Sequence, residues 1–313
     1  MTPTDMSKVR EACAIAGHVR DYVASLMKPG ELLIDVALAG HARIHELGGR
    51  AAFPLQISRN HIAAHYCPFI GDETRFREGD LVKADVGVHV DGFVADTATT
   101  VDLSSDGRHE SLRLAAREAL DAAIRVAGPD VEVAEIGRAI EQAIIARGFK
   151  PIRNLTGHGV DRWCIHKAPQ IPNVPSGRGR LRADTFVAIE PFSTDGEGLI
   201  HEEGDAHVFM ARKVGKKLKG AHPKVVQAVA EFRGLPFGSR DLVQCFPFQQ
   251  VAETLNAMNR AHQLIAYPPL CEKKGRMVAQ FEHTLYISDS GAEVLTSASK
   301  AWPEERARRV SSG

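Results

Sequence analysis

Two aspartates stand near the ends of one alternating stretch, D-V-G-V-H-V-D-G-F-V-A-D-T, which covers residues 85–97. The dipeptide Asp91-Gly92 favours a two-residue type I′ turn, so the stretch predicts a β-hairpin with Asp96 opposite Gly87. Because side chains alternate along a strand, Asp85 and Asp96 would then be diagonal neighbours on one face, with Cβ atoms about 7–8 Å apart or less. Two like charges so close are costly unless a cation or a proton neutralises them.

Three further residues could complete a metal site with these aspartates. His158 lies between glycines in T-G-H-G-V, Glu190 ends the apolar strand of F-V-A-I-E-P-F, and Glu282 lies inside the strand-like V-A-Q-F-E-H-T-L-Y-I. A carboxylate in a buried strand is costly unless it is paired or binds metal. Each residue alone also has an ordinary explanation, as a solvated hairpin aspartate, a paired core glutamate or a loop histidine.

Taken together, four carboxylates and one imidazole suit two divalent ions such as Mn, Fe, Co or Zn. Two such ions lower the pKa of a shared water and polarise the carbonyl that this water attacks. The residues therefore predict a dinuclear hydrolytic site with the two aspartates as its floor.

Helical periodicity surrounds these stretches and suggests a duplication. Apolar spacing predicts helices over about 5–27, 32–47, 108–127 and 131–147. The second and fourth of these align at an offset of 100 residues, and each ends at a glycine, Gly48 and Gly148. Two α+β halves related by a pseudo-twofold axis would give this pattern, although two unrelated amphipathic helices can also resemble each other.

The composition and the pattern of the sequence change after about residue 210. A basic run over 212–219 is followed by helical patterns at 225–232 and 249–265. We therefore expect a catalytic domain formed by residues 1–210 and 267–313, with a helical subdomain inserted at 211–266. The basic run is expected to be a solvated edge, and the C-terminal segment a partly ordered tail.

Composition excludes several classes of protein. The 313 residues are 44% hydrophobic and 25% charged, and 39 basic residues balance 39 acidic ones. This balance favours neither nucleic acid nor an anionic membrane as a partner. The five cysteines are dispersed without a C-x-x-C pair, the polar N-terminus lacks a signal-peptide core, and no apolar run approaches the ~20 residues of a membrane span. We expect a cytoplasmic monomer.

The same motifs, in this order, resemble the pita-bread metallopeptidases, and more narrowly the type 2 methionine aminopeptidases. The resemblance covers about residues 5–297, including K-A-D-V-G-V-H-V-D-G-F-V-A-D-T, G-H-G-V, A-I-E-P-F and A-Y-P-P-L-C-E-K-K-G-R-M-V-A-Q-F-E-H-T. Glu282 follows Glu190 by 92 residues, a long gap of the kind in which type 2 enzymes insert a helical subdomain. The resemblance implies an α+β pita-bread fold with duplicated halves and an antiparallel sheet flanked by helices.

The resemblance also implies roles for individual residues. It makes Asp85, Asp96, His158, Glu190 and Glu282 the ligands of two divalent ions, with Asp96 and Glu282 bridging them and Glu190 also moving a proton. It places His65, in A-A-H-Y, and His166, in C-I-H-K, against the scissile peptide of a substrate. Its methionine pocket maps onto Phe53, Ile165, Tyr267 and, less closely, His207. The activity implied is removal of the initiator methionine from new polypeptides.

One departure and two alternatives accompany this resemblance. Lys167-Ala168-Pro169 stands where the family has a small Ala-Gly pair, which puts the width of the pocket in question. A proline-specific peptidase or creatinase-like hydrolase of the same fold is one alternative, although those enzymes carry an extra N-terminal domain. A pita-bread binding protein without catalysis is the other, although such relatives lack metal ligands, and all five are present here.

Overall fold

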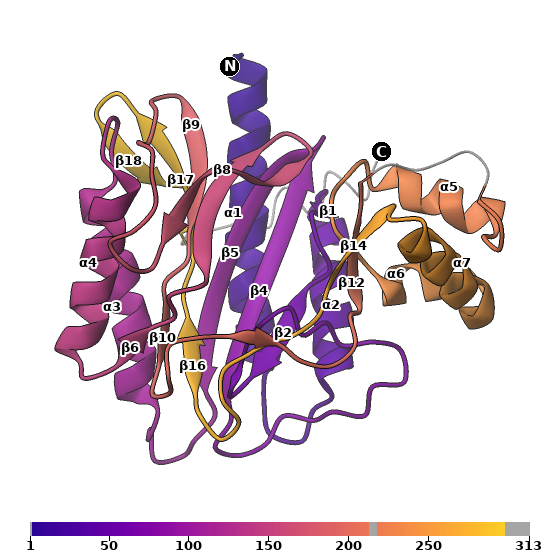
Figure 1. Ribbon diagram of the computed structural model, residues 1–313, viewed down its shortest axis with the longest axis horizontal. Helices are drawn as coiled ribbons and strands as arrows, with labels where there is room; N and C mark the ends of the chain where they lie inside the picture. Colours follow the sequence, from indigo (N-terminus) through magenta and orange to yellow (C-terminus); the bar gives the residue numbers. More distant parts are fainter. Residues whose placement is uncertain (1, 213–217, 298–313) are drawn as a thin grey trace.

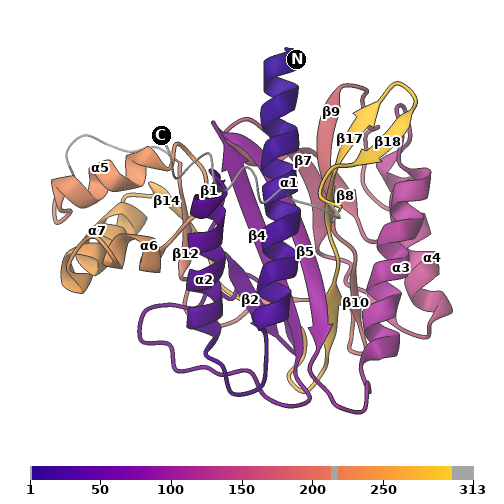
Figure 2. The ribbon, with the colours of Figure 1, turned by 180° about the vertical axis from the view of Figure 1, so that it is seen from behind.

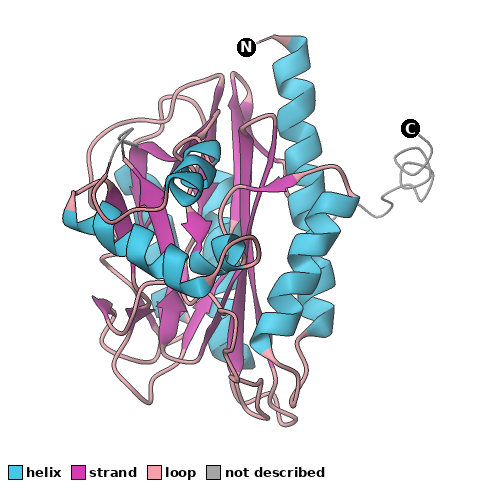
Figure 3. Ribbon diagram, turned by 90° about the vertical axis from the view of Figure 1, so that its right-hand side faces the viewer, coloured by secondary structure: helices cyan, strands magenta, loops and turns pink. Residues whose placement is uncertain are grey.

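The computed structural model describes residues 2–212 and 218–297, and in it the long helices pack on one side of a wall of strands (Figure 1). Seen from behind, α1 and α2 cover β4 and β5, while α3 and α4 cover the other half of the wall (Figure 2). In the edge-on view, the long helix α1 stands beside the strands, and shorter helices overlap the strands on the side that faces the viewer (Figure 3). The helices are α1 (Pro3–Leu26), α2 (Leu33–Glu46), α3 (Glu110–Val126), α4 (Val133–Ala146), α5 (Pro223–Glu231), α6 (Ser239–Val243) and α7 (Phe248–Arg260).

The strands pair antiparallel in every sheet of the described chain. The sheet orders are β1-β4-β2 with β5 on β4, β16-β10-β6, β11-β15-β3, β13-β12-β14 and β18-β17-β9-β7-β8. The strands are β1 (Arg50–Ala51), β2 (Gln56–Arg59), β3 (Ile62–Ala64), β4 (Leu81–Val90), β5 (Phe93–Asp102), β6 (Lys150–Pro151), β7 (Thr156–Asp161), β8 (Cys164–Pro172), β9 (Thr185–Ile189), β10 (Phe192–Thr194), β11 (His201–Glu202), β12 (Val208–Ala211), β13 (Phe237–Gly238), β14 (Leu264–Tyr267), β15 (Leu270–Cys271), β16 (Val278–Gln280), β17 (His283–Ser288) and β18 (Gly291–Val294).

The hairpin predicted from D-V-G-V-H-V-D-G-F-V-A-D-T is formed by β4 and β5 in the predicted register. Gly87 lies opposite Asp96, and Asp85 lies opposite Ala98. Asp91 and Gly92 have φ angles of 50° and 85°, and a type I′ turn needs positive φ at both positions. The hairpin therefore sets the two aspartates on one face.

Helix α1 buries one side against this hairpin. Thr2 and Asp5 form a reciprocal capping box and Pro3 occupies the first turn, which explains why the helix starts before the predicted residue 5. Its buried residues recur at helical spacing, as the sequence pattern predicted, and they pack on β4 and β5. This packing supports the hairpin from behind and leaves its other face to the site.

The two halves of the chain repeat each other at the predicted offset. Helices α2 and α4 begin and end 100 residues apart, Gly48 and Gly148 follow them with φ angles of 85° and 81°, and β1 and β6 come next. Each half has its own apolar cluster, one around α1, α2 and β4, the other around α3, α4 and β17. The duplicated architecture is confirmed.

Residues 218–264 form a separate apolar cluster at one edge of the wall. The predicted helix over 249–265 ends earlier, at Arg260, because Leu264–Tyr267 pairs with β12 as strand β14. Long-range strand pairing thus overrides the local helical pattern here. The domain boundaries at 211 and 266 stay predictions. Most of the basic run 212–219, and the C-terminal tail from residue 298, lie outside the described residues.

Within the described part of the chain, no helix combines the length and apolar character needed to cross a membrane.

Candidate metal and catalytic site

A cavity of about 710 Å³ opens on the face of the wall away from α1, and all five predicted ligands line it. Asp85 and Asp96 come from β4 and β5, and His158 comes from β7. Glu190 directly follows β9, as predicted. Glu282 was expected inside a strand, but it lies in the two-residue link between β16 and β17.

The ligand-type atoms of these residues are close together. His158 Nε2 lies 3.7 Å from Asp96 Oδ2 and 3.6 Å from Glu190 Oε1. Asp96, His158 and Glu282 each offer one ligand atom, and these three atoms lie within 4.8 Å of one another. Two ligands bound to one ion at about 2.0–2.2 Å stand up to about 4.4 Å apart, so small side-chain shifts would suffice to hold an ion.

Burial makes this concentration of acid unfavourable without a cation. Burial raises the pKa of Asp85 to about 7. It also raises the pKa of Asp96, Glu190 and Glu282 well above the usual range, and the negative charges of the neighbouring carboxylates add to the effect. Burial lowers the pKa of His158 to about 3, which keeps its imidazole neutral, as a metal ligand must be.

Unpartnered polar atoms supply an independent test of whether metal fits. Asp85 Oδ1, Asp96 Oδ1 and Glu282 Oε1 are buried without a hydrogen-bond partner. Buried polar atoms are nearly always satisfied, and such exceptions call for an explanation. Three orphaned carboxylate oxygens facing one cavity, beside a neutral imidazole, fit divalent cations of the hard or borderline kind.

The backbone around the ligands is fixed by cross-links between β5 and the 282–284 segment. Thr284 Oγ1 accepts from Asp96 N at 2.8 Å and donates to Asp96 O at 2.7 Å. Thr97 Oγ1 donates to Glu282 O at 2.8 Å. These bonds hold the two proposed bridging carboxylates, Asp96 and Glu282, in a set relation.

The glycines beside His158 are needed for close packing of strands. A Cβ at Gly157 would lie 2.4 Å from the Ala188 carbonyl oxygen, and one at Gly159 would lie 2.8 Å from that of Ala168. Neither contact is possible for a real Cβ, so the glycines let β7 approach its neighbours and set His158 at the cavity.

Two further histidines face the same cavity. The rings of His158 and His166 make an edge contact at 4.5 Å between centroids. His65 has its Nδ1 buried without a partner, and burial lowers the pKa of this imidazole to about 4. The structure thus brings His65 and His166 to the ligands, where both can be neutral near pH 7.

Three of the four residues predicted to form the methionine pocket lie at the cavity, and the fourth does not. Phe53, Ile165 and Tyr267 line the cavity. His207 is not among the cavity-lining residues, because its ring stacks on Phe69 at 4.2 Å and its Nδ1 is 3.1 Å from Ser239 Oγ. Its neighbour Val208, the first residue of β12, lines the cavity, because successive side chains of an extended chain point to opposite sides.

Two glutamines were missed by sequence reasoning. Gln280 Nε2 donates to Glu190 Oε2 at 3.2 Å, and Gln56 Oε1 accepts from His65 N at 2.8 Å. The second bond holds His65 at a positive φ of 67°. Gln280 ends the apolar strand β16, where a polar residue was the available signal, whereas Gln56 begins the mixed strand β2, Q-I-S-R, which offered none.

Two other buried histidines, His89 and His283, have packing roles. His89 Nδ1 accepts from Gly92 N at 3.1 Å, and its ring lies 4.9 Å from that of Trp163, so it supports the hairpin turn. His283 Nδ1 is 2.9 Å from Thr296 Oγ1, within a buried network that includes Arg20.

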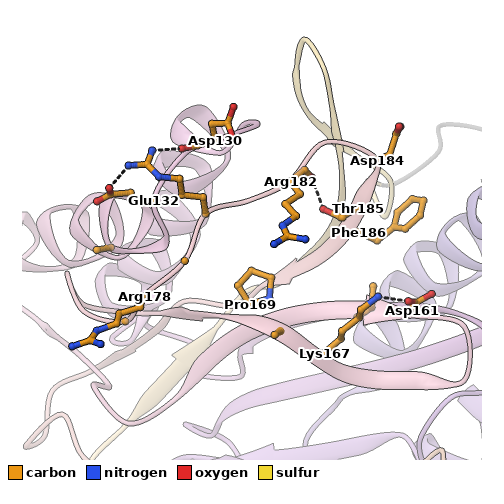
Figure 4. A pocket seen from close by; sticks show the side chains of 16 residues that line it. Asp130, Glu132, Asp161, Lys167, Pro169, Arg178, Arg182, Asp184, Thr185 and Phe186 are labelled. Carbon is orange, nitrogen blue, oxygen red and sulfur yellow. Dashed lines mark hydrogen bonds and ion pairs between the residues drawn. The ribbon is translucent and has the colours of Figure 1, made fainter.

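A larger cavity, about 980 Å³, lies beside the first, and Figure 4 shows the side chains that line it. None of the lining residues is a predicted ligand, so the smaller cavity is the candidate site despite its size. The two cavities share Lys167–Pro169, the segment that departs from the family pattern. Lys167 pairs with Asp161 on the side of the larger cavity, which draws its charge away from the carboxylates.

Comparison with known proteins places this geometry in a family. The sequence model that describes metallopeptidase family M24 matches residues 7–289 of the chain. Methionine aminopeptidases from Thermococcus onnurineus and Pyrococcus horikoshii are 42% and 41% identical to the chain, over 91% and 93% of its length and 97% and 99% of theirs.

Among solved structures, a methionine aminopeptidase from Thermotoga maritima superposes with a TM-score of 0.70 at 24% identity, covering 95% of this chain and 98% of that one. This match confirms the pita-bread fold predicted from the sequence. The family uses metal in peptide hydrolysis, in agreement with the cluster of ligand-type side chains. The chain belongs to metallopeptidase family M24.

Proposed function

We propose that this protein is a methionyl aminopeptidase, which hydrolyses the first peptide bond of polypeptides that begin with methionine. The observation that carries the proposal is that four carboxylates and His158 line one cavity, together with apolar side chains. Relatives named methionine aminopeptidase, 41–42% identical over almost their whole length, support the substrate class.

The ligand set would hold two divalent ions, drawn from Co, Mn, Fe or Zn. Asp85, Asp96, His158, Glu190 and Glu282 would be the ligands, with Asp96 and Glu282 shared between the ions. When bound, the ions supply Lewis-acid polarisation of the scissile carbonyl and lower the pKa of a nucleophilic water.

The remaining chemistry falls to side chains of the chain itself. Glu190, oriented by its bond from Gln280, would take a proton from the attacking water and give it to the leaving amine. His65 and His166 would hydrogen-bond the scissile peptide and the oxyanion that develops from its carbonyl. The unpartnered Nδ1 of His65 is an atom for which a substrate would supply the missing partner.

Alanine at either histidine should therefore impair turnover more than binding. We expect His65→Ala and His166→Ala each to lower kcat by about 100-fold or more while KM changes little, because the bonds strengthen as the oxyanion forms. Steady-state kinetics on a methionyl tripeptide measures both constants. His222→Ala is the control, since His222 pairs with Glu253 on the surface and should keep normal kinetics. A raised KM at unchanged kcat would contradict the proposed role.

The walls of the cavity suit an apolar side chain. The cavity that holds the ligands is also lined by Phe53, Ile165 and Tyr267. The segment shared with the larger cavity would let the rest of a polypeptide substrate extend beyond the site. Selection for methionine would rest on shape, because one methylene changes binding by only about 1–3 kcal/mol.

One glycine tests this pocket. A Cβ at Gly87 would lie 2.2 Å from the Phe53 ring, so Gly87→Ala must displace that ring. We expect KM for methionyl peptides to rise about tenfold, the loss of roughly 1.4 kcal/mol of side-chain binding. Thermal melting of the variant controls for the fold. Unchanged KM for methionyl substrates would place the side-chain pocket elsewhere.

Peptide hydrolysis distinguishes this activity from the alternatives. The protein should release free methionine from Met-Ala-Ser, act much more slowly on Leu-Ala-Ser, and leave Ala-Pro intact. Cleavage of Ala-Pro in preference to Met-Ala-Ser would favour the proline-specific alternative. Cytoplasmic location, a monomeric state and the absence of a specific nucleic-acid partner stay predictions of the sequence.

A further inference from the structure

A second group of metal-ligating side chains lies apart from the carboxylates. His61, Glu203 and Cys271 each offer one ligand atom, and these three atoms lie within 4.8 Å of one another. None of the three lines the cavity of the candidate site. Unlike that site, the group contains a sulfur.

The backbone holds this group in place through the β11-β15-β3 sheet. His61 directly precedes β3, and its carbonyl accepts from Glu272 N at 2.8 Å. Glu203 directly follows β11, and its N–H donates to Pro269 O at 3.0 Å. Cys271 lies in β15, the central strand, so three separate segments of the chain meet at the group.

A fourth candidate ligand lies on the same face. His201 is opposite Cys271 in the antiparallel register of β11 and β15, which points both side chains to one side of the sheet. Its Nε2 lies 3.4 Å from Glu203 Oε2. Two imidazoles, one carboxylate and one thiolate form a four-ligand set suited to tetrahedral zinc and its substitute cobalt.

The exposure of these four side chains also fits an ion site that is open to solvent on one side. The Cys271 side chain is buried, His61 is half-buried, and Glu203 and His201 are exposed. Burial, and after it the negative charge of Glu203, raises the pKa of the Cys271 thiol to about 11. An ion would enter from the exposed side and displace the thiol proton.

We propose that His61, Glu203 and Cys271 bind a divalent transition-metal ion of the zinc type, with His201 as a fourth ligand. The ion would cross-link β3 to β15. β3 leads directly into His65, and Leu270 of β15 lines the catalytic cavity. The site is therefore a structural clamp on one cavity wall, and it does not depend on the function proposed above.

Cobalt tests the clamp because thiolate ligands give Co²⁺ a strong near-ultraviolet charge-transfer band. The candidate catalytic set offers only oxygen and nitrogen, so this band reports the clamp alone. We expect the metal-stripped full-length protein to develop the band when Co²⁺ is added, and to lose it when Zn²⁺ displaces the cobalt. Absence of the band in the unaltered protein would overturn the proposal.

Variants assign the band to the group. Cys271→Ser should abolish it, whereas Cys67→Ser, at another buried free cysteine, and Asp96→Asn, in the catalytic set, should keep it. A band that survives Cys271→Ser, or that disappears in Asp96→Asn, contradicts the assignment. Glu203 is exposed, so Glu203→Ala should fold normally and weaken cobalt binding by about tenfold or more. Unchanged affinity in Glu203→Ala would also overturn the proposal.

Discussion

Glu282→Gln is expected to abolish methionine release while the protein stays folded. Glu282 is 1% exposed, has one oxygen without a partner, and has a ligand atom within 4.8 Å of those of Asp96 and His158. An amide of the same shape cannot bridge two cations as a carboxylate does. Losing several kcal/mol of transition-state stabilisation corresponds to about a 1,000-fold fall in kcat. Steady-state hydrolysis of Met-Ala-Ser measures the loss, and Asp96→Asn should behave in the same way.

A second glutamate provides the matched control. Glu272 is equally buried, but its two oxygens accept from Gly198 N and Lys273 N, and it lies outside the cavity. Glu272→Gln should therefore keep its turnover number even if it lowers the melting temperature. In the absence of metal, Glu282→Gln should melt above the unaltered protein at pH 8, because it removes one of the mutually repelling buried carboxylates. A turnover number near normal in Glu282→Gln would contradict the ligand assignment.

The metal-free protein is expected to lose stability as the pH rises from 6.5 to 8. Burial raises the pKa of Asp85 to about 7, and burial with neighbouring negative charge raises that of Asp96, Glu190 and Glu282 well above the usual range. The folded state therefore binds more protons than the unfolded state, in which these carboxyls are fully ionised above about pH 6. Stability falls with pH wherever the folded state holds the extra protons.

Other buried groups titrate near this window in known directions. The buried histidines with lowered pKa, such as His41 and His283, raise the stability as the pH rises toward about 7.5, because their unfolded forms release protons around pH 6.5. This contribution opposes that of the four carboxyls and is smaller. The buried thiols affect it only above about pH 8.5. We expect the melting temperature to drop by roughly 5 °C or more across the window. Saturating Mn²⁺ should remove the slope, since cations replace the protons, and Glu282→Gln should reduce it. A metal-free protein with a melting temperature independent of pH would contradict the electrostatic account.

Local patterns carried most of the prediction from sequence. The Asp91-Gly92 turn determines the β4–β5 register, and this register alone puts Asp85 and Asp96 on one face. Apolar spacing located α1, α2, α3 and α4 to within a few residues, because each buries a single face against strands. The order of the short motifs then identified the family.

Features that depend on distant segments could not be predicted in this way. Leu264–Tyr267 has a helical pattern but forms a strand because β12 is available to pair with it. Val208, and not His207, lines the cavity because of the direction in which the first residue of β12 points, which the local sequence does not reveal. The hydrogen bond from His65 N to Gln56 Oε1 joins the residue after β3 to β2, and spacing along the chain does not indicate which buried amide will support which histidine.

The most direct test of the account is to add metal back to stripped protein and to measure free methionine from Met-Ala-Ser. The protein should be inactive after metal removal, should regain activity as Mn, Fe, Co or Zn fills the carboxylate set, and should leave Ala-Pro uncleaved throughout. Full methionine release from thoroughly metal-stripped protein, or no release with any of these ions, would contradict the claim that the buried carboxylates bind the cations that drive this hydrolysis.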